Sequence, residues 1–473
     1  MKRVVILGGG IAGLTAAYRR AGEGETVVLE AGPAPGGSVK TVREDGFVVE
    51  GGPSTLRTSA AADRLLKDLG LEPRVVVADP KAPRWIVRGG RPRPVVPGPA
   101  GLFNTVFTTR GKLRLLKEPF VPARPAHLED ESVASFFARR FGEEAARYGA
   151  GPMVSGVYAG DPDAVSMRSG FPRLWEAEGR AGSVVKGFLS KKEKGDPERR
   201  GAGGAAGNES APPEQSGGGR APARHRARTL TFDSGLYLLI ETLQTASSAR
   251  PGCRVETSAA ASAIEGPLPS PGPRWRVRTA DGRTFAADTL VSTLDAPVVA
   301  RLLGSRLVRS GAALAAMKTS PVTVVALAWP DGSGSPRGFG ALVPRGEGIR
   351  SLGVLYPSSL FSKRAPAGSI LTTSFLGGAL DPELASAPDA EVLAVATAEA
   401  RRLHPLLPSA PARSWIFRWA AAIPRLELFH FRTLSAVEED LGSLPGLVLT
   451  GGWRDGIAMG ERIARGEAIG LSL

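Results

Sequence analysis

The residues with the clearest chemical use are three glycines, Gly8, Gly10 and Gly13, and one acid, Glu30. The glycines follow the spacing G-x-G-x-x-G. The first allows a tight turn, the second lets the backbone approach a pyrophosphate, and the third lets a helix pack closely on a strand. Glu30 follows twenty-two positions after Gly8, where a carboxylate can accept hydrogen bonds from ribose hydroxyls and would repel the 2′-phosphate of NADP. These residues predict a site for a dinucleotide with an unphosphorylated ribose.

These residues must be positioned by a strand, a helix and a second strand, in that order. The apolar, β-branched run Val4–Leu7 predicts a buried strand, and Thr26–Leu29 predicts a second strand that ends at Glu30. Between them, a helix that begins near Ile11 would direct its free N–H groups and the positive end of its dipole at the phosphates. A glycine pattern alone is weak evidence, but the full order of elements is typical of a dinucleotide site.

A second glycine-bearing loop lies near the C-terminus. Leu447–Thr450 predicts a strand, Gly451–Gly460 predicts a loop, and a helix is expected from there to about Gly470. A loop that leads from a strand into a helix N-terminus again favours an anion. The dinucleotide domain is therefore predicted to be discontinuous, with the other segments inserted between its two ends.

The middle of the chain predicts other kinds of structure. Residues 100–190 are expected to be mostly helical, because apolar residues recur at helical spacing between Val133 and Phe141. Residues 191–228 are rich in Gly, Ala, Pro, Ser and charge, cannot bury enough apolar surface to fold, and are expected to form a flexible insert. Asp281-Gly282 predicts a hairpin turn. Strands dominate after residue 321 and predict an antiparallel or mixed sheet: Val322–Trp329, Phe339–Val343, Leu352–Tyr356, Ile370–Leu376 and Trp415–Trp419.

Composition narrows the possible functions. The 473 residues allow two or three domains, and the formal net charge is +14. Residues 80–124 hold ten Lys and Arg against one acid, Glu118, with apolar residues interleaved. Such a tract fits an anionic membrane surface or an acidic substrate, and a solvated basic face is the alternative. Nucleic acid is disfavoured because no binding module is recognisable. One cysteine and four scattered histidines predict neither an internal disulfide nor a metal site.

The N-terminal residues, the apolar runs and the cysteine content predict where in the cell the protein is located. Lys2-Arg3 lead straight into the first strand, so no signal peptide is expected, and no apolar run is long enough to predict a transmembrane helix. A single cysteine, Cys253, indicates a reducing compartment. We therefore expect a cytoplasmic protein, with a peripheral position at the inner face of the cell membrane if the basic tract binds lipid.

The glycine loop, Glu30, the pair Gly36-Gly37 and the closing loop together resemble the flavin-containing amine oxidase superfamily. Within it, Gly46–Ser54 and Ser155–Glu176 are similar to segments of the oxygen-dependent protoporphyrinogen oxidase family, and the second is the more specific. Shorter similar strings follow in the same order at Arg84–Arg88, Phe339–Pro344 and Phe375–Gly378. The resemblance covers essentially the whole chain except residues 191–228.

The resemblance implies FAD as the cofactor. Backbone N–H groups of the closing loop would face the isoalloxazine ring and stabilise negative charge on the reduced flavin. Ser38 stands where the superfamily usually has an arginine, which removes one contact near the cofactor, and Trp453 fits either a cover over the flavin or ordinary packing. The residues that the resemblance places at the cofactor are Gly8, Gly10, Ile11, Ala12, Gly13, Glu30, Ala31, Gly36, Gly37, Ser38, Gly51, Gly52, Pro53, Ser54, Val255, Trp453, Gly456, Ile457, Ala458 and Met459.

On the substrate side, the resemblance implies oxidation of protoporphyrinogen IX to protoporphyrin IX, a late step of heme biosynthesis, with oxygen as acceptor and hydrogen peroxide as product. The flavin would carry the redox chemistry, so no acid–base residue is expected. Arg84 would bind a propionate through charge-assisted hydrogen bonds, Leu342 and Phe375 would sandwich the ring, and the backbone of Gly156 would face it. The basic stretch 100–124 would correspond to the family's membrane-associating region. A homodimer is among the expected assemblies.

Three alternatives remain open. A coproporphyrinogen III oxidase of the same family would act on a tetracarboxylate, and Arg88 or Arg91 could supply the additional cationic contacts. An amine oxidase or carotenoid desaturase is a second alternative, although the aromatic pair expected beside the flavin of an amine oxidase is not identifiable. A non-catalytic flavoprotein that serves as a membrane-surface scaffold is disfavoured by the intact glycine loops.

The predicted fold class is therefore α/β with three kinds of domain. The ranges are 1–80, 229–296 and 425–473 for a discontinuous Rossmann-like FAD-binding domain, 81–99 and 297–424 for an antiparallel or mixed-sheet substrate domain, 100–190 for an inserted α-helical membrane-associating domain, and 191–228 for the flexible insert.

Overall fold

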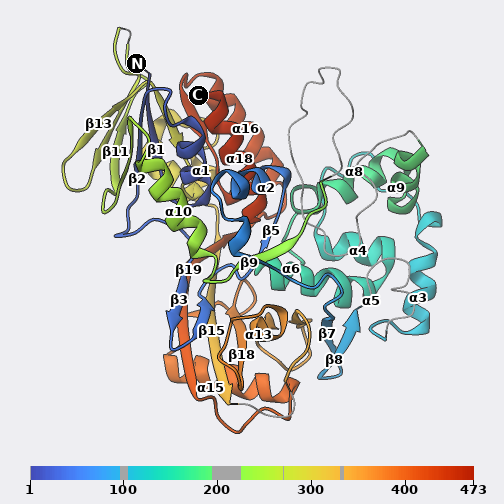
Figure 1. The fold of residues 1–473 in the computed structure, drawn as a ribbon. Helices are drawn as coiled ribbons and strands as arrows, with labels where there is room; N and C mark the ends of the chain where they lie inside the picture. Colours follow the sequence, from blue (N-terminus) through green and yellow to red (C-terminus); the bar gives the residue numbers. More distant parts are fainter. Residues whose placement is uncertain (1, 96–104, 194–224, 270, 331–334) are drawn as a thin grey trace.

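A five-stranded parallel sheet joins segments from both ends of the chain (Figure 1). The computed structural model describes residues 2–95, 105–193, 225–269, 271–330 and 335–473. The strand order is β10-β2-β1-β14-β20, and every neighbouring pair is parallel. The strands span Arg3–Leu7 (β1), Glu25–Leu29 (β2), Cys253–Glu256 (β10), Thr289–Ser292 (β14) and Leu447–Leu449 (β20). The predicted strands at the two ends of the chain are confirmed, and they belong to one sheet.

Helices cover both faces of this sheet. α1 (Ile11–Arg20) begins at the predicted residue and packs against α18 (Met459–Ser472). The two helices approach closely because Gly466 and Gly470 of α18 have no side chain. A Cβ added at either residue would lie 2.4 or 2.5 Å from a carbonyl oxygen of α1. α2 (Ala60–Asp68) and α10 (Tyr237–Ser248) join this layer, whereas α11 (Ala296–Leu303), α12 (Gly311–Ala315) and α16 (His430–Gly442) cover the opposite face.

The described residues also form three smaller sheets. β11 (Ala261–Glu265), β12 (Trp275–Thr279) and β13 (Thr284–Ala287) are antiparallel, and the turn between the last two confirms the hairpin predicted at Asp281-Gly282. The other sheets are β3 (Thr41–Glu44) with β4 (Phe47–Glu50), and β5 (Leu56–Arg57) with β9 (Thr229–Phe232) and β6 (Val75–Val77).

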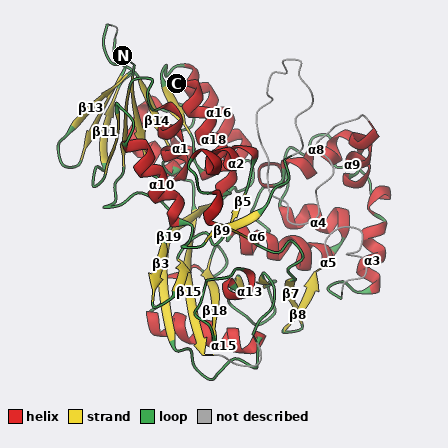
Figure 2. Cartoon of the chain, viewed as in Figure 1, coloured by secondary structure: helices red, strands yellow, loops and turns green. Residues whose placement is uncertain are grey.

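A separate seven-stranded sheet has the order β19-β15-β18-β17-β16-β7-β8 and lies below the parallel sheet in Figures 1 and 2. It is mixed, as predicted: β16 and β7 are parallel, and the other neighbours are antiparallel. α15 (Asp389–Leu403) covers one of its faces. The bounds are Arg84–Arg88 (β7), Arg91–Val95 (β8), Thr319–Pro330 (β15), Gly340–Leu342 (β16), Gly353–Leu355 (β17), Ser369–Gly377 (β18) and Arg413–Pro424 (β19), with the short helices α13 (Pro357–Leu360) and α14 (Pro382–Ser386) beside them.

The described residues between 105 and 193 are mostly helical, as predicted. Their apolar core is centred on Phe136 and Trp175, which are almost fully buried. Its polar centre is Glu118, which forms a fully buried ion pair with Arg140 and accepts hydrogen bonds from Ser183 Oγ and two backbone N–H groups. The one acid of the basic tract is therefore a structural hub. The helices are α3 (Thr109–Leu116), α4 (Val133–Phe141), α5 (Glu143–Ala145), the π-helical turn η4 (Ala146–Ala150), α6 (Gly151–Tyr158), α7 (Met167–Gly170), α8 (Pro172–Ala181) and α9 (Val184–Glu193), with the 3₁₀ turn η3 at Glu118–Phe120.

Two boundaries differ from expectation. The predicted flexible insert falls mainly on residues 194–224, which lie outside the described residues, but α9 runs into its start. At its other end, His225 and Arg228 are placed by hydrogen bonds to Asp63 of α2. The closing loop also contains a short helix, α17 (Gly452–Asp455), that the glycine-rich pattern does not predict.

Candidate functional site

The glycine loop between β1 and α1 has the geometry that a phosphate needs. Gly8 has a φ of 101°, and a Cβ at Gly13 would lie 2.1 Å from the Gly8 carbonyl oxygen, so the first and third positions require glycine. Gly10 is the N-cap of α1 and provides no capping side chain. The N–H groups of the first turn therefore lack a side-chain acceptor and can bind an anion.

The Gly36-Gly37 loop lies directly opposite. Gly36 donates its N–H to the carbonyl of Gly9 at 2.9 Å, and Gly37 has a φ of 57°. A Cβ added to Gly10 would have one neighbour within 4 Å, the Cα of Gly37 at 4.0 Å. The two loops thus form a narrow cradle that side chains on either loop would fill.

Glu30 lies at the C-terminal end of β2, on the wall of this cradle. Its two carboxylate oxygens accept one backbone hydrogen bond each, from Gly9 and from Gly32, both at 2.8 Å. An ionised carboxylate has about four acceptor positions, so the oriented group can still accept two ribose hydroxyls. Val255, on the neighbouring strand β10, pairs with Val28 two residues before Glu30.

The closing loop lies beside the helical segment. α18 begins at Met459 without a capping side chain on Ala458, and Gly456 has a φ of 96° with the Glu461 carboxylate against it. Ile457 packs against the apolar core of the helical segment. The backbone N–H groups of this loop are thus held between the two parts of the molecule, where they can serve as donors.

Of the two interpretations that the sequence allows for Trp453, the structure favours packing in the core over a cover for the cofactor. The Trp453 ring is 1% exposed and its indole N–H donates to the Leu294 carbonyl at 3.1 Å, so no face of the ring is free. Its own carbonyl oxygen lies 2.7 Å from His430 Nε2. Packing into the core beneath the parallel sheet therefore accounts for this residue.

The Gly51–Ser54 segment joins the cradle to the seven-stranded sheet. A Cβ at Gly52 would lie 2.0 Å from the Ser38 carbonyl oxygen, and one at Gly51 would lie 2.4 Å from the Phe417 ring. Trp419 Nε1 donates to the Gly51 carbonyl at 2.6 Å. Phe417 and Trp419 were missed at the sequence level, because this contact joins positions 368 apart and leaves no local pattern.

The register of the seven-stranded sheet brings the predicted substrate residues onto one face. Ile86, Leu342, Gly353 and Phe375 are aligned across β7, β16, β17 and β18. Directly paired residues point to the same face of a sheet, and so do residues two apart on one strand. Arg84, two residues before Ile86, therefore shares this face.

Gly156 of α6 covers the same face. A Cβ on Gly156 would lie 2.4 Å from Leu342 Cδ2 and 3.5 Å from the Leu352 carbonyl oxygen. The missing side chain therefore brings the helix backbone against the apolar row. All four residues predicted for the substrate thus meet at one surface.

Arg84 is a half-buried cation on this surface. Its guanidinium stacks over the Phe339 ring, 5.3 Å from the centroid. Burial and the nearby Arg57 guanidinium both lower the pKa of Arg84. Arg84 forms no ion pair with an acid in the part of the chain that the structure describes. A carboxylate brought by a ligand would relieve this unbalanced charge.

The site can bind and orient but holds little reactive chemistry of its own. Within the described ranges, no three His, Cys, Asp or Glu side chains are grouped to hold a metal ion. The one buried acid beside the Gly51 segment, Glu50, is engaged with Arg364, Thr41 and a backbone N–H, and burial raises its pKa. Electron transfer at this surface would therefore depend on a cofactor bound in the cradle.

Comparisons with known proteins agree with this arrangement. Residues 11–455 match the family described as flavin containing amine oxidoreductase. The chain is 31% identical to protoporphyrinogen oxidase 1 of Arabidopsis thaliana chloroplasts, over 97% of this chain and 85% of the relative. It is 26% identical to coproporphyrinogen III oxidase of Bacillus subtilis, over 99% and 97%. Among solved structures, a candidate protoporphyrinogen oxidase from Exiguobacterium matches with a TM-score of 0.77 at 22% identity, over 100% and 98%.

Proposed function

The chain belongs to the flavin-containing amine oxidoreductases and is an FAD-dependent oxidoreductase, and from this premise we propose that it oxidises protoporphyrinogen IX to protoporphyrin IX. Oxygen is the proposed acceptor and hydrogen peroxide the product. The observation that carries the proposal is the single sheet face on which Arg84, Leu342 and Phe375 meet, next to the Gly51–Ser54 segment.

The cradle fits FAD. Its narrowest part, between Gly10 and Gly37, is free of side chains, and Glu30 is already oriented by two backbone donors. Among the described residues, Ser54 Oγ is buried beside this region without a hydrogen-bond partner, as expected for a group to which a ligand would hydrogen-bond. The pyrophosphate would lie at the α1 N-terminus, the ribose at Glu30, and the ring system between Gly51–Ser54 and the closing loop.

The redox chemistry, removal of hydride equivalents from the macrocycle, is supplied by the FAD. The residues of this chain bind and orient the substrate. Leu342 and Phe375 offer an apolar face to a flat ring and exclude water from it, and the backbone at Gly156 packs against Leu342 at the border of this face. Arg84 would hold a propionate, because a guanidinium donates two parallel hydrogen bonds to a carboxylate.

A second candidate is the oxidation of coproporphyrinogen III, which uses the same ring chemistry. The observation in its favour is that further arginines lie at the end of the same sheet face, on β7 and β8. Arg88, suggested above for the extra carboxylates, is already paired with Glu144 at 2.7 Å. The contacts that would distinguish coproporphyrinogen III from protoporphyrinogen IX must therefore come from other arginines near Arg88.

Aerobic turnover of both porphyrinogens by the purified flavoprotein tests the proposal. We expect a flavin spectrum, porphyrin fluorescence that rises faster than in the enzyme-free control, and formation of peroxide. Flavin binding without acceleration of either reaction would refute the proposal. The ratio of kcat/KM for the two substrates identifies the preferred one.

The proposal includes docking on an anionic membrane surface. Leu113, Leu116 and Phe120 are 56%, 57% and 85% exposed, and Lys112 and Lys117 stand among them. The proposed contact is interfacial, through these apolar side chains and the lysines among them. No helix in the described ranges is long and apolar enough to cross a bilayer.

Flotation with phosphatidylglycerol vesicles tests the docking surface. The triple variant Leu113→Ser, Leu116→Ser, Phe120→Ser should lose binding, whereas Val308→Ser, at a residue 84% exposed on the other part of the molecule, should keep it. Equal binding by both variants would show that this surface does not dock.

A further inference from the structure

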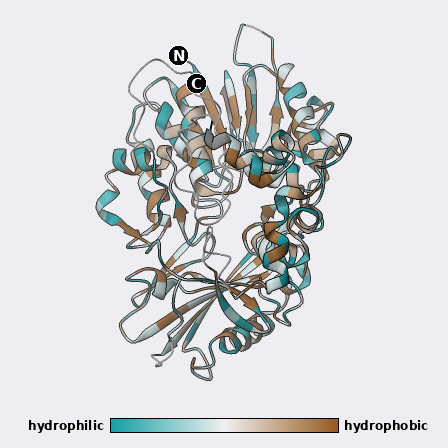
Figure 3. Ribbon diagram, turned by 90° about the vertical axis from the view of Figure 1, so that its right-hand side faces the viewer, coloured by the Kyte–Doolittle hydropathy of each residue, from teal (hydrophilic) through white to brown (hydrophobic). Residues whose placement is uncertain are grey.

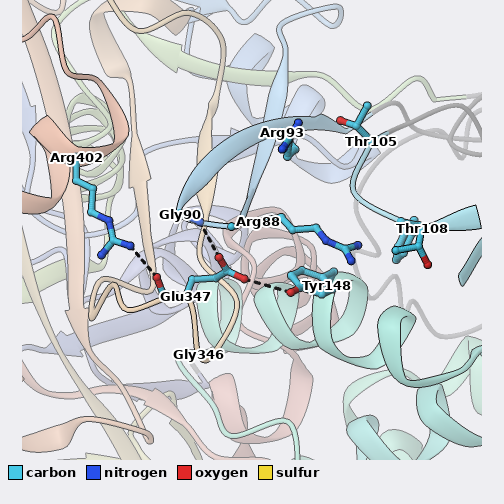
Figure 4. Close-up of a pocket in the computed structure, with 11 residues that line it drawn as sticks. Arg88, Gly90, Arg93, Thr105, Thr108, Tyr148, Gly346, Glu347 and Arg402 are labelled. Carbon is cyan, nitrogen blue, oxygen red and sulfur yellow. Dashed lines mark hydrogen bonds between the residues drawn. The ribbon is translucent and has the colours of Figure 1, made fainter.

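An open cavity of about 640 Å³ lies at the tip of the β7–β8 hairpin. Its walls come from the hairpin tip, from the segment before α3, from Tyr148 of the η4 turn and from the loop at Gly346-Glu347 (Figure 4). Arg402, at the end of α15, closes one side. The glycines at the tip and in the loop keep the walls free of side chains, and a Cβ at Gly89 would meet nothing within 4 Å.

Positive charge predominates around this cavity. Arg88, Arg93 and Arg402 line it, and Arg147 stacks on the Tyr148 ring, 5.2 Å from its centroid. Arg88 stacks on the Tyr148 ring, 4.4 Å from its centroid, while its charge is balanced by Glu144. Arg402 donates to the backbone carbonyls of residues 347 and 348. In the described residues, Arg93 and Arg402 form no ion pair with a carboxylate.

The carboxylates nearby are already engaged. Glu347 is 9% exposed and accepts hydrogen bonds from the Gly90 N–H at 2.9 Å and the Tyr148 hydroxyl at 3.2 Å. Glu144 accepts from Arg88 and from both the N–H and the hydroxyl of Thr108. These contacts fix the floor of the cavity and leave the charges of Arg93 and Arg402 unbalanced by a described carboxylate, although Arg402 also donates to two backbone carbonyls.

The cavity lies at the far end of the substrate surface. Along β7, Arg84, Ile86 and Arg88 share one face, so the apolar row at Ile86 is flanked by a cation on each side. Four strand residues span about 13 Å. Arg93 pairs with Ile86 across the hairpin and faces the same way.

Two other segments also run between the cavity and the apolar row. The chain of η4 and α6 runs from Tyr148 at the cavity to Gly156 over Leu342, eight residues or about 12 Å of helix. The loop after β16 runs four residues from Leu342 to Gly346. A macrocycle centred on the apolar row would therefore direct one edge at Arg84 and the opposite edge at the cavity.

We propose that this cavity is a second carboxylate site, which binds acidic side chains on the edge of a tetrapyrrole opposite to Arg84. The inference rests on the proposed function. Protoporphyrin carries its two carboxylates on one edge, where Arg84 suffices. Coproporphyrin carries four, around the ring, and would engage both sites, so the second site would add affinity for coproporphyrin alone.

Equilibrium binding of the two finished porphyrins to the FAD-loaded protein tests the assignment without turnover. The variant Arg93→Glu with Arg402→Glu should weaken coproporphyrin III binding by about tenfold or more, from the loss of two charge-assisted contacts, and protoporphyrin IX binding by less than about twofold. The control variant, Arg276→Glu with Arg278→Glu, makes the same change of charge on β12, whose neighbours β11 and β13 lie far from β7 and β8 (Figure 1). The variant Arg93→Ala with Arg402→Ala should also weaken coproporphyrin III binding more than protoporphyrin IX binding, but by a smaller factor.

Each outcome is decisive. Equal weakening of both porphyrins, or no more weakening than in the control, overturns the second site while the proposed function stands. If the unmodified holoprotein binds neither porphyrin, the proposed function fails, and the second site fails with it.

Discussion

Replacement of Arg84 by alanine tests the substrate surface most directly. The guanidinium is half-buried, lacks an acidic partner among the described residues and is repelled by Arg57, so a substrate carboxylate would supply its counter-charge. A hydrogen bond to a charged group contributes about 1.5–3 kcal/mol, which corresponds to about 10- to 150-fold in affinity. We expect KM for the porphyrinogen to rise within this range.

The flavin content should not change, because Arg84 lies on the seven-stranded sheet and the cradle is built by β1, α1 and β2. Arg84→Lys should give an intermediate KM, since lysine keeps the charge but loses the paired donors. The exposed Arg301 of α11 provides the control substitution, Arg301→Ala. The assay is steady-state porphyrin fluorescence, with flavin per chain measured by absorbance. A KM for Arg84→Ala within about twofold of the unmodified enzyme would refute the propionate role.

Three further predictions concern the cradle, the helical core and pH. Gly13→Ala should abolish stable FAD binding, measured as flavin retained on gel filtration, because the new Cβ would lie 2.1 Å from the Gly8 carbonyl oxygen. Glu118→Gln should destabilise the helical segment by about 1–3 kcal/mol, measured by denaturant unfolding, because it removes the nearer of the two buried carboxylates beside Arg140 and leaves only Glu178, 3.5 Å away. Burial lowers the pKa of His404 from 6.5 to about 4, so between these pH values the imidazole is protonated in the unfolded chain but not in the folded one. The stabilisation is present above pH 6.5 and is lost as the pH falls towards 4, and the thermal midpoint of His404→Gln should fall less over this interval.

Matched substitutions make these tests specific. Gly442→Ala places its Cβ in open space and should retain FAD. Glu143→Gln removes an exposed carboxylate from the helical segment, and His127→Gln removes an exposed imidazole. Retention of flavin by Gly13→Ala, equal unfolding of the two glutamine variants at 118 and 143, or an unchanged pH slope in His404→Gln would each contradict the corresponding reasoning.

The sequence by itself determined the cofactor half of this protein. Gly8, Gly10, Gly13 and Glu30 lie within one strand–helix–strand unit, and short-range backbone geometry requires these residue types at these positions. The hairpin at Asp281-Gly282 and the mixed sheet also followed from local patterns. Residues that touch only sequence neighbours, or that must be glycine for a positive φ, leave a signature that can be read directly.

Only the tertiary structure decided how the substrate half is assembled. Arg84, Leu342 and Phe375 come from three strands far apart in the chain, and only their register shows that they share a face. Only the structure shows that Trp453 packs in the core and that Glu118 is buried against Arg140, because the type of a side chain does not reveal which distant partners enclose it. Arg93 of β8 and Arg402 of α15 likewise line one cavity only because the folded chain brings the end of α15 to the β7–β8 hairpin. Long-range packing, which depends on the whole chain at once, is the reason that local patterns could not show these features.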